Sequence, residues 1–348
     1  MEYAVFFIML LFALLMLPFS TAAFDGAREG IKLFAGSVLP ALFPFMVCSH
    51  YIMRSSVLSR LRGRSGALVK LAAFVLSAIC GTPSSAVITR ELFSSGVFER
   101  KRASVICAAF NMTGPLFIVS TLCGAMLKNS AFAYAFAVSH YLPPLIFALI
   151  PSTKSGRLPP SPPSSPIKKD APLRLFSEAV SDAVLTVLRA GGVIVFFRIL
   201  LSLADAVGAL NSFPLEARGL TIGLLEMTNG VGLLAEAPSR LSLSFCAFLL
   251  SFGGASFFIQ AKLIFPELSA GSYFLIKLLC GVASGISFWF VFPFVPVPAE
   301  TLWDMSESLN EALPSLGSRL APFLCGCAAT GAALIVSMLY SKLARAKK

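Results

Sequence analysis

The chain has 348 residues, of which 57% are hydrophobic and 13% are charged, and its mean hydropathy is +0.83. A soluble chain would be about one quarter charged, so the composition excludes an ordinary soluble domain and indicates a polytopic membrane protein. The net charge of +11 favours cytoplasmic basic loops and contact with anionic lipid, while no motif supports binding to nucleic acid.

Several uncharged runs reach the roughly 20 residues that a membrane span requires. The first run has no Lys or Arg before it, so we expect a retained span at about 3–19 rather than a signal peptide. A second span is expected at 31–53, followed by others in chain order. The remaining expected spans are 103–127, 130–150, 176–204, 241–265, 271–295 and 320–341.

An apolar segment at 71–95 lies between two basic loops, 54–70 and 98–102. Since basic loops stay in the cytoplasm, this segment is expected to enter the membrane and return on the same side. Its tip contains Gly81, Thr82 and Pro83, and irregular backbone at membrane depth is tolerated inside protein or along a watery cavity. Secondary transporters build substrate sites from such broken elements.

The second half of the chain repeats the order of spans and hairpin found in the first half. A stretch at 219–235 lies between charged loops and predicts a second re-entrant hairpin, now from the outside. We therefore predict an all-α polytopic membrane protein with about eight transmembrane helices plus two re-entrant hairpins in an inverted repeat. The expected parts are a first transmembrane helix (1–23), repeat one (24–150), a Pro-rich cytoplasmic linker (151–174), inverted repeat two (175–296), and an acidic outer loop, last transmembrane helix and basic tail (297–348).

Glu226 is an acidic residue inside an otherwise uncharged stretch at membrane depth. An ionisable group there costs roughly 2.5 kcal/mol or more unless it is paired or hydrated. Its carboxylate is interpreted as a ligand for a solute or a proton, or alternatively as the structural partner of Arg189.

Two expected spans are interrupted at corresponding places, one around Gly114-Pro115 and the other around Gly253-Gly254. Such breaks free backbone groups for a ligand, although small residues also serve ordinary helix packing. The hairpin tips and these breaks supply the candidate substrate-binding residues. They are Glu226, Asn111, Thr113, Thr82, Ser84, Ser85, Thr228, Asn229, Ser251, Ser256 and Arg189.

The sequence favours no cofactor, no metal and no enzymatic activity. Its eight cysteines lie in apolar runs without a CxxC pair, and it has only two histidines, so a zinc or iron–sulfur site is not expected. The motifs of nucleotide hydrolysis, metalloproteolysis and serine hydrolysis do not occur.

Several motifs resemble one known family. The runs are Val38-Leu-Pro-Ala-Leu-Phe-Pro-Phe, Gly81-Thr-Pro-Ser-Ser-Ala, Glu91-Leu-Phe, Asn111-Met-Thr-Gly-Pro-Leu-Phe-Ile and Gly223-Leu-Leu-Glu-Met-Thr-Asn-Gly. They look like those of the YlbJ-type sporulation integral membrane proteins, which belong with the nucleoside-recognition, or Gate-domain, proteins. The resemblance implies a multi-pass protein of the bacterial cytoplasmic membrane, involved in sporulation, with a Gate-like repeat at 24–150.

The expected function is a secondary transporter or conduit for a small polar solute, with a site at the membrane midplane. The resemblance to the Gate-domain proteins implies a nucleoside-like solute. The alternative is a non-transporting membrane scaffold that recruits spore-envelope assembly proteins. A transporter needs its buried polar residues, whereas a scaffold needs its loops.

Overall fold

The computed structural model describes residues 2–54, 66–94, 98–149, 172–209 and 213–295. Over these ranges every regular element is helical and no strand occurs, which confirms the all-α prediction. Most of the predicted linker at 151–174, and all of the predicted outer loop, last span and tail at 297–348, lie outside the described residues.

The N-terminal part is more helical than predicted. Helix α1 (Glu2–Met16) ends before a turn that contains Pro18, and the chain then bends by 105° into α2 (Ser20–Leu33). A π-helical turn η1 (Phe34–Val38) connects α2 directly to α3 (Leu39–Arg54). The polar loop expected between the first two spans is therefore helix. Gly26 and Gly30 explain this, because both lie against the backbone or Cβ atoms of a later helix.

The rest of the first half consists of short helices around an irregular stretch. Helix α5 (Gly66–Cys80) turns at Gly81-Thr82-Pro83 into α6 (Ser84–Ser94). Residues 111–114 are not helical and divide one predicted span in two. The elements on either side are α7 (Arg100–Phe110), the π-helical η2 (Phe117–Met126) and α8 (Phe132–Leu149).

The second half begins with the longest helix in the described residues, α9 (Pro172–Ala206). It is followed by α10 (Leu215–Leu225) and α11 (Met227–Leu234), which are separated only by Glu226. The later helices are α12 (Arg240–Phe252), α13 (Gly254–Ile264), α14 (Ala270–Val291) and the 3-10 turn η3 (Phe292–Phe294).

Four helical stretches in the described residues are long and apolar enough to cross a membrane, or five if the bent pair of α1 and α2 counts as one span. They support a membrane protein and coincide with four of the predicted spans. The stretches are Phe132–Leu149, Leu173–Ala206, Arg240–Ile264 and Ala270–Phe294.

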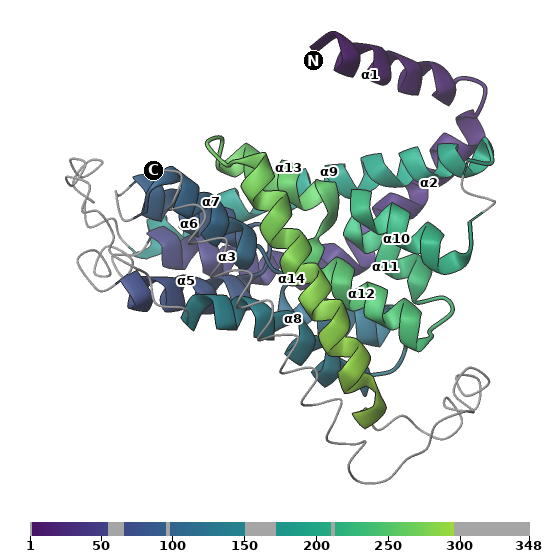
Figure 1. Ribbon diagram of the computed structural model, residues 1–348. Helices are drawn as coiled ribbons and strands as arrows, with labels where there is room; N and C mark the ends of the chain where they lie inside the picture. The colour runs from purple at the N-terminus through teal and green to yellow at the C-terminus, as the bar shows by residue number, and fades with distance from the viewer. Residues whose placement is uncertain (1, 55–65, 95–97, 150–171, 210–212, 296–348) are drawn as a thin grey trace, which may run out of the picture.

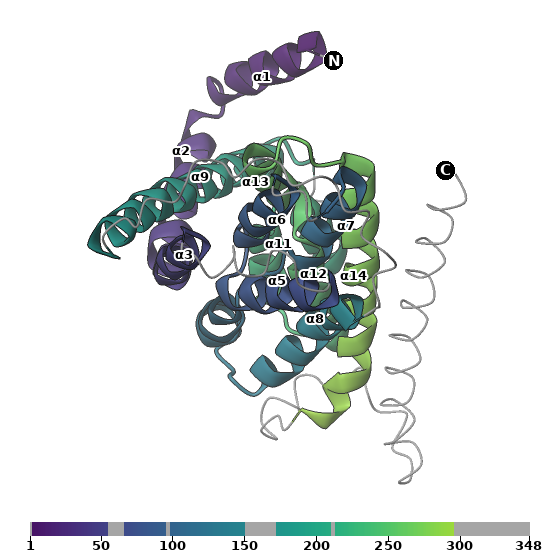
Figure 2. The ribbon, with the colours of Figure 1, turned by 90° about the vertical axis from the view of Figure 1, so that its left-hand side faces the viewer.

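The short helices lie between two longer ones. Helix α14 crosses one face and packs along α12, while α9 lies along α2 and α3 on another side (Figures 1 and 2). The two larger of the three apolar clusters in the described residues contain Met112 and Phe110 in one case and Phe117 and Met227 in the other. The irregular stretch at 111–114 thus lies where the chain passes from one cluster to the other.

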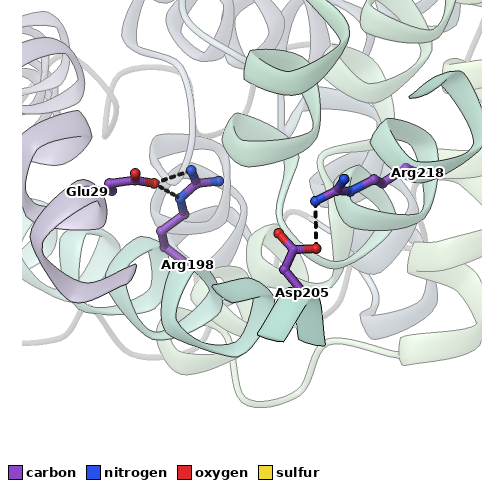
Figure 3. A network of polar contacts seen from close by, with 4 residues as sticks. All are labelled: Glu29, Arg198, Asp205 and Arg218. Atoms are coloured by element: carbon purple, nitrogen blue, oxygen red, sulfur yellow. Dashed lines mark hydrogen bonds and ion pairs between the residues drawn. The ribbon is translucent and has the colours of Figure 1, made fainter. Parts of the chain in front are cut away.

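Helix α9 is joined to its neighbours by two ion pairs (Figure 3). Arg198 pairs with Glu29 of α2, with its Nε 3.0 Å from the carboxylate oxygen, and Asp205 pairs with Arg218 of α10 at 2.6 Å. All four side chains are partly exposed, so each pair is worth about 1 kcal/mol or less. Their main effect is to fix which faces of α9 meet α2 and α10.

Candidate functional site

The second predicted hairpin is a tight antiparallel pair of helices, α10 and α11. A Cβ atom on Gly230 would lie 2.3 Å from Cα of Gly223 and 2.6 Å from the carbonyl oxygen of Gly219. The two backbones therefore touch, and only glycine allows such an approach. This contact places Glu226 at the tip of the hairpin.

Glu226 caps the N-terminus of α11. Its carboxylate accepts the backbone N–H groups of Thr228 at 3.0 Å and Asn229 at 2.7 Å, and the residue is 1% exposed. The N–H groups of the first helical turn, which have no partner within the helix, and the positive end of the helix dipole stabilise the negative charge of the carboxylate. Pairing with Arg189, the alternative interpretation of Glu226, does not occur in the described residues. In the described residues Glu226 forms no ion pair, and the Arg189 side chain lies on an exposed face of α9.

The tip of the first hairpin rests on the first break. Gly81 has φ +71°, and a Cβ atom there would lie 2.7 Å from the backbone nitrogen of Gly114. The Thr82 hydroxyl donates to the carbonyl of Met112 at 2.8 Å. These two contacts hold the α5–α6 turn against the irregular stretch that follows α7.

The second tip rests on the second break in the same manner. Gly253 and Gly254 have φ values of +80° and +73°, so the chain turns sharply between α12 and α13. A Cβ atom on Gly254 would lie 2.8 Å from the carbonyl oxygen of Gly223 and 3.0 Å from that of Leu225. Each hairpin tip is therefore fitted by glycine contacts to the interrupted helix pair that follows it.

A cavity of about 30 Å³ lies where these elements meet. Its apolar walls come from η1, α3, α9 and α13, and its polar lining includes residues of both tips and of the first break. Such a volume holds about two water-sized particles. The polar lining residues are Thr82, Thr113, Glu226, Thr228 and Gln260.

Six other candidate residues are buried but do not line the cavity: Asn111, Ser84, Ser85, Asn229, Ser251 and Ser256. Asn111 accepts from the Ser85 hydroxyl at 3.0 Å and donates to the hydroxyl of Tyr273 at 2.6 Å. It therefore connects α6 to α14 across the first break. The side chains of Asn111 and Ser85 therefore belong to a structural hydrogen-bond network and do not line the cavity.

The remaining serines and one amide also lie outside the cavity lining. Ser84 donates weakly to the sulfur of Met46, and Ser256 lies 3.5 Å from the Gly253 carbonyl. Ser251 is hydrogen-bonded to His140 Nδ1 at 2.7 Å. The side-chain nitrogen of Asn229 is buried without a partner in the described residues.

Lys277 of α14 is a buried cation that the sequence analysis missed. Its ammonium donates to the carbonyl oxygen of Asn111 at 2.7 Å, at the C-terminal end of α7. A positive charge is favourable there because unpaired carbonyls give this helix end a partial negative charge. The criterion that selected Glu226 applies equally to Lys277, the one charged residue of Ala270–Val291.

Replacing Asn111 by Leu is expected to destabilise the protein. The change leaves the buried hydroxyls of Ser85 and Tyr273 without their shared partner, and an unsatisfied buried group costs about 1–3 kcal/mol. Thermal unfolding of the purified protein measures the loss, and Ser94→Ala, which removes an exposed side chain, is the control. An unchanged unfolding temperature for Asn111→Leu would contradict the structural role given to this amide.

Comparisons with known proteins give one similarity. Over 317 aligned residues the chain is 24% identical to "Sporulation integral membrane protein YlbJ" of Bacillus subtilis (strain 168), and the alignment covers 76% of each chain. No family model matches, and no solved structure matches. The similarity confirms the resemblance to YlbJ-type proteins that the motifs predict.

Proposed function

Because this chain resembles the YlbJ-type sporulation integral membrane proteins, we propose that it is a multi-pass protein of the bacterial cytoplasmic membrane that moves a small polar solute during sporulation. The observation that carries the proposal is the cavity between the two hairpin tips, which contains the buried carboxylate of Glu226. A cavity that contains a few polar groups and is framed by broken helices is the arrangement that secondary transporters use.

The proposal includes an inverted repeat. In each half a helical hairpin is followed by an interrupted helix pair and then by a longer helix: α5–α6, α7–η2 and α8 in the first, α10–α11, α12–α13 and α14 in the second. The glycine contacts of Gly81 with Gly114 and of Gly254 with Leu225 supply the same tip-to-break packing twice. Two such units with opposite orientation would meet at the midplane.

The inverted repeat predicts opposite sides for two exposed positions. Glu99 precedes α7 and Ala237 precedes α12, so in inverted repeats they face the cytoplasm and the outside respectively. In a cysteine-free background, an impermeant thiol reagent added to intact cells is expected to label Ala237→Cys and to spare Glu99→Cys. Labelling of both or of neither would contradict the inverted arrangement.

The expected partners are the solute and anionic lipid. Arg100 and Lys101 at the start of α7 are exposed, where basic residues can meet acidic headgroups on the cytoplasmic side. A nucleoside-like solute follows only from the resemblance to Gate-domain proteins. The cavity of about 30 Å³ is closed to a molecule of that size, so such a solute would require the two tips to separate.

Solute profiling of proteoliposomes tests the proposed function. Vesicles containing the purified full-length protein are expected to accumulate at least one small polar solute from an extract of sporulating cells, when compared with protein-free vesicles. If folded protein enriches no solute, the chain is not a transporter, and the non-transporting scaffold that recruits spore-envelope proteins becomes the better account.

A further inference from the structure

Two hydroxyl groups of the cavity lining, those of Thr82 and Thr113, present hydrogen-bond acceptors to its occupant. Thr82 Oγ1 donates to the Met112 carbonyl at 2.8 Å, and Thr113 Oγ1 donates to the Leu250 carbonyl at 2.9 Å. A hydroxyl has one proton and two lone pairs. Because the backbone takes both protons, these two oxygens can only accept hydrogen bonds or coordinate a cation from the cavity.

Glu226 adds a negative charge that its surroundings only partly balance. Each carboxylate oxygen accepts one backbone N–H and keeps further lone pairs. A helix N-terminus supplies roughly half a positive charge. In the described residues no Lys or Arg forms an ion pair with it: Arg198, whose charge also acts on Glu226, pairs with Glu29, and Lys277 donates to the Asn111 carbonyl.

The size of the cavity and the charge of its lining limit which ligands it can bind. A volume of about 30 Å³ accepts a water-sized particle and excludes a nucleoside. Calcium and magnesium prefer sites with more oxygen ligands or bound phosphate, and calcium sites usually contain several carboxylates, whereas Glu226 is the one carboxylate in this lining. A buried carboxylate is favoured when a counter-charge accompanies it.

We propose that the cavity binds a monovalent cation that is no larger than about a water molecule, Na⁺ or NH₄⁺, through the Glu226 carboxylate, the hydroxyl oxygens of Thr82 and Thr113, and the amide oxygen of Gln260. This inference rests on the proposed function, because the bound cation would be the ion that the transporter carries or couples to its solute. Choline is too large for the same cavity and provides a cation of equal charge for comparison.

Thermal unfolding of the purified full-length protein in detergent tests this site. At fixed pH and ionic strength, NaCl or NH₄Cl is expected to raise the unfolding temperature in a saturable manner, as any ligand of the folded state does, while choline chloride does not. Glu226→Gln is expected to abolish the response. Glu236→Gln, which changes an exposed carboxylate after α11, should keep it.

A second variant tests the cation site in case Glu226→Gln does not fold. The Gln260 side chain forms no hydrogen bond in the described residues, so Gln260→Leu should fold. Its loss of one oxygen ligand is expected to weaken the apparent cation affinity about tenfold, equivalent to about 1.4 kcal/mol. A wild-type affinity in Gln260→Leu would contradict the assigned ligand set.

Three results would overturn the site itself. The first is an equal unfolding temperature of the wild type in Na⁺, NH₄⁺ and choline. The second is a full cation response in folded Glu226→Gln. The third is stabilisation by lower pH alone, which would indicate that Glu226 binds a proton and not a cation. Because binding is measured without transport, cation binding without solute uptake would contradict the proposed function and leave the site intact. Solute uptake without a cation response would contradict the cation site and leave the proposed function intact.

Discussion

Replacing Glu226 by Gln is expected to reduce solute uptake at least tenfold while most of the protein stays folded. The glutamine oxygen can still accept one of the two N–H groups now bound by the carboxylate, so the cap is weakened by about 1–2 kcal/mol and not removed. The negative charge in the cavity is lost completely, and with it the strongest acceptor available to a solute or cation.

Uptake by proteoliposomes and thermal unfolding of the same preparation measure these two effects separately. Glu236→Gln is the matched control, because it makes the same chemical change at an exposed position. Uptake at the wild-type rate by Glu226→Gln would remove this carboxylate from the transport site. A collapse of folding without a specific loss of uptake would instead make it purely structural.

Replacing Gly230 by Ala is expected to give the largest loss of stability of any single methyl addition in the hairpin. The new Cβ atom would lie 2.3 Å from Cα of Gly223, so the backbones of α10 and α11 must move apart. Overpacking of this kind costs up to about 3 kcal/mol, and the movement also displaces Glu226 from the cavity. Thermal unfolding should show a clear decrease.

Gly192→Ala is the matched control for this prediction. A Cβ atom on Gly192 meets nothing within 4 Å, and the residue lies inside the long helix α9. The same substitution there should therefore leave stability unchanged or raise it by about 1 kcal/mol, since alanine favours helix over glycine. Equal effects of the two substitutions would contradict the tight packing of the hairpin.

The hairpin tip and the two breaks were predictable because their signals are local. Gly81-Thr82-Pro83, Gly114-Pro115 and Gly253-Gly254 contain residues that favour turns or interrupt helices, and the structure interrupts the helices at these places. Spacing along a helix was less informative. Arg189 was predicted to belong to the site, but only tertiary packing decides which face of α9 points inward, and Arg189 is exposed.

Other features depended on partners that are distant in the sequence. The stretch around Glu29 lies between the expected spans at 3–19 and 31–53, yet it is helical, and Gly26 and Gly30 pack closely against α9. Asn111 is a predicted solute ligand, and its amide also joins Ser85 to Tyr273, which are distant in the sequence. Neither packing partner could be identified from the sequence alone.

Cysteine accessibility at the cavity tests the central claim, that the two tips enclose a site which exchanges with water. Thr113→Cys lines the cavity, whereas Ser284→Cys replaces a buried side chain on α14 that donates to the Ala247 carbonyl. In a cysteine-free background, a small water-soluble thiol reagent should modify Thr113→Cys when the two tips separate, and saturating solute or cation should slow the reaction. Ser284→Cys should remain unmodified. If Thr113→Cys is as unreactive as Ser284→Cys, the tips enclose packed protein interior and the account is contradicted.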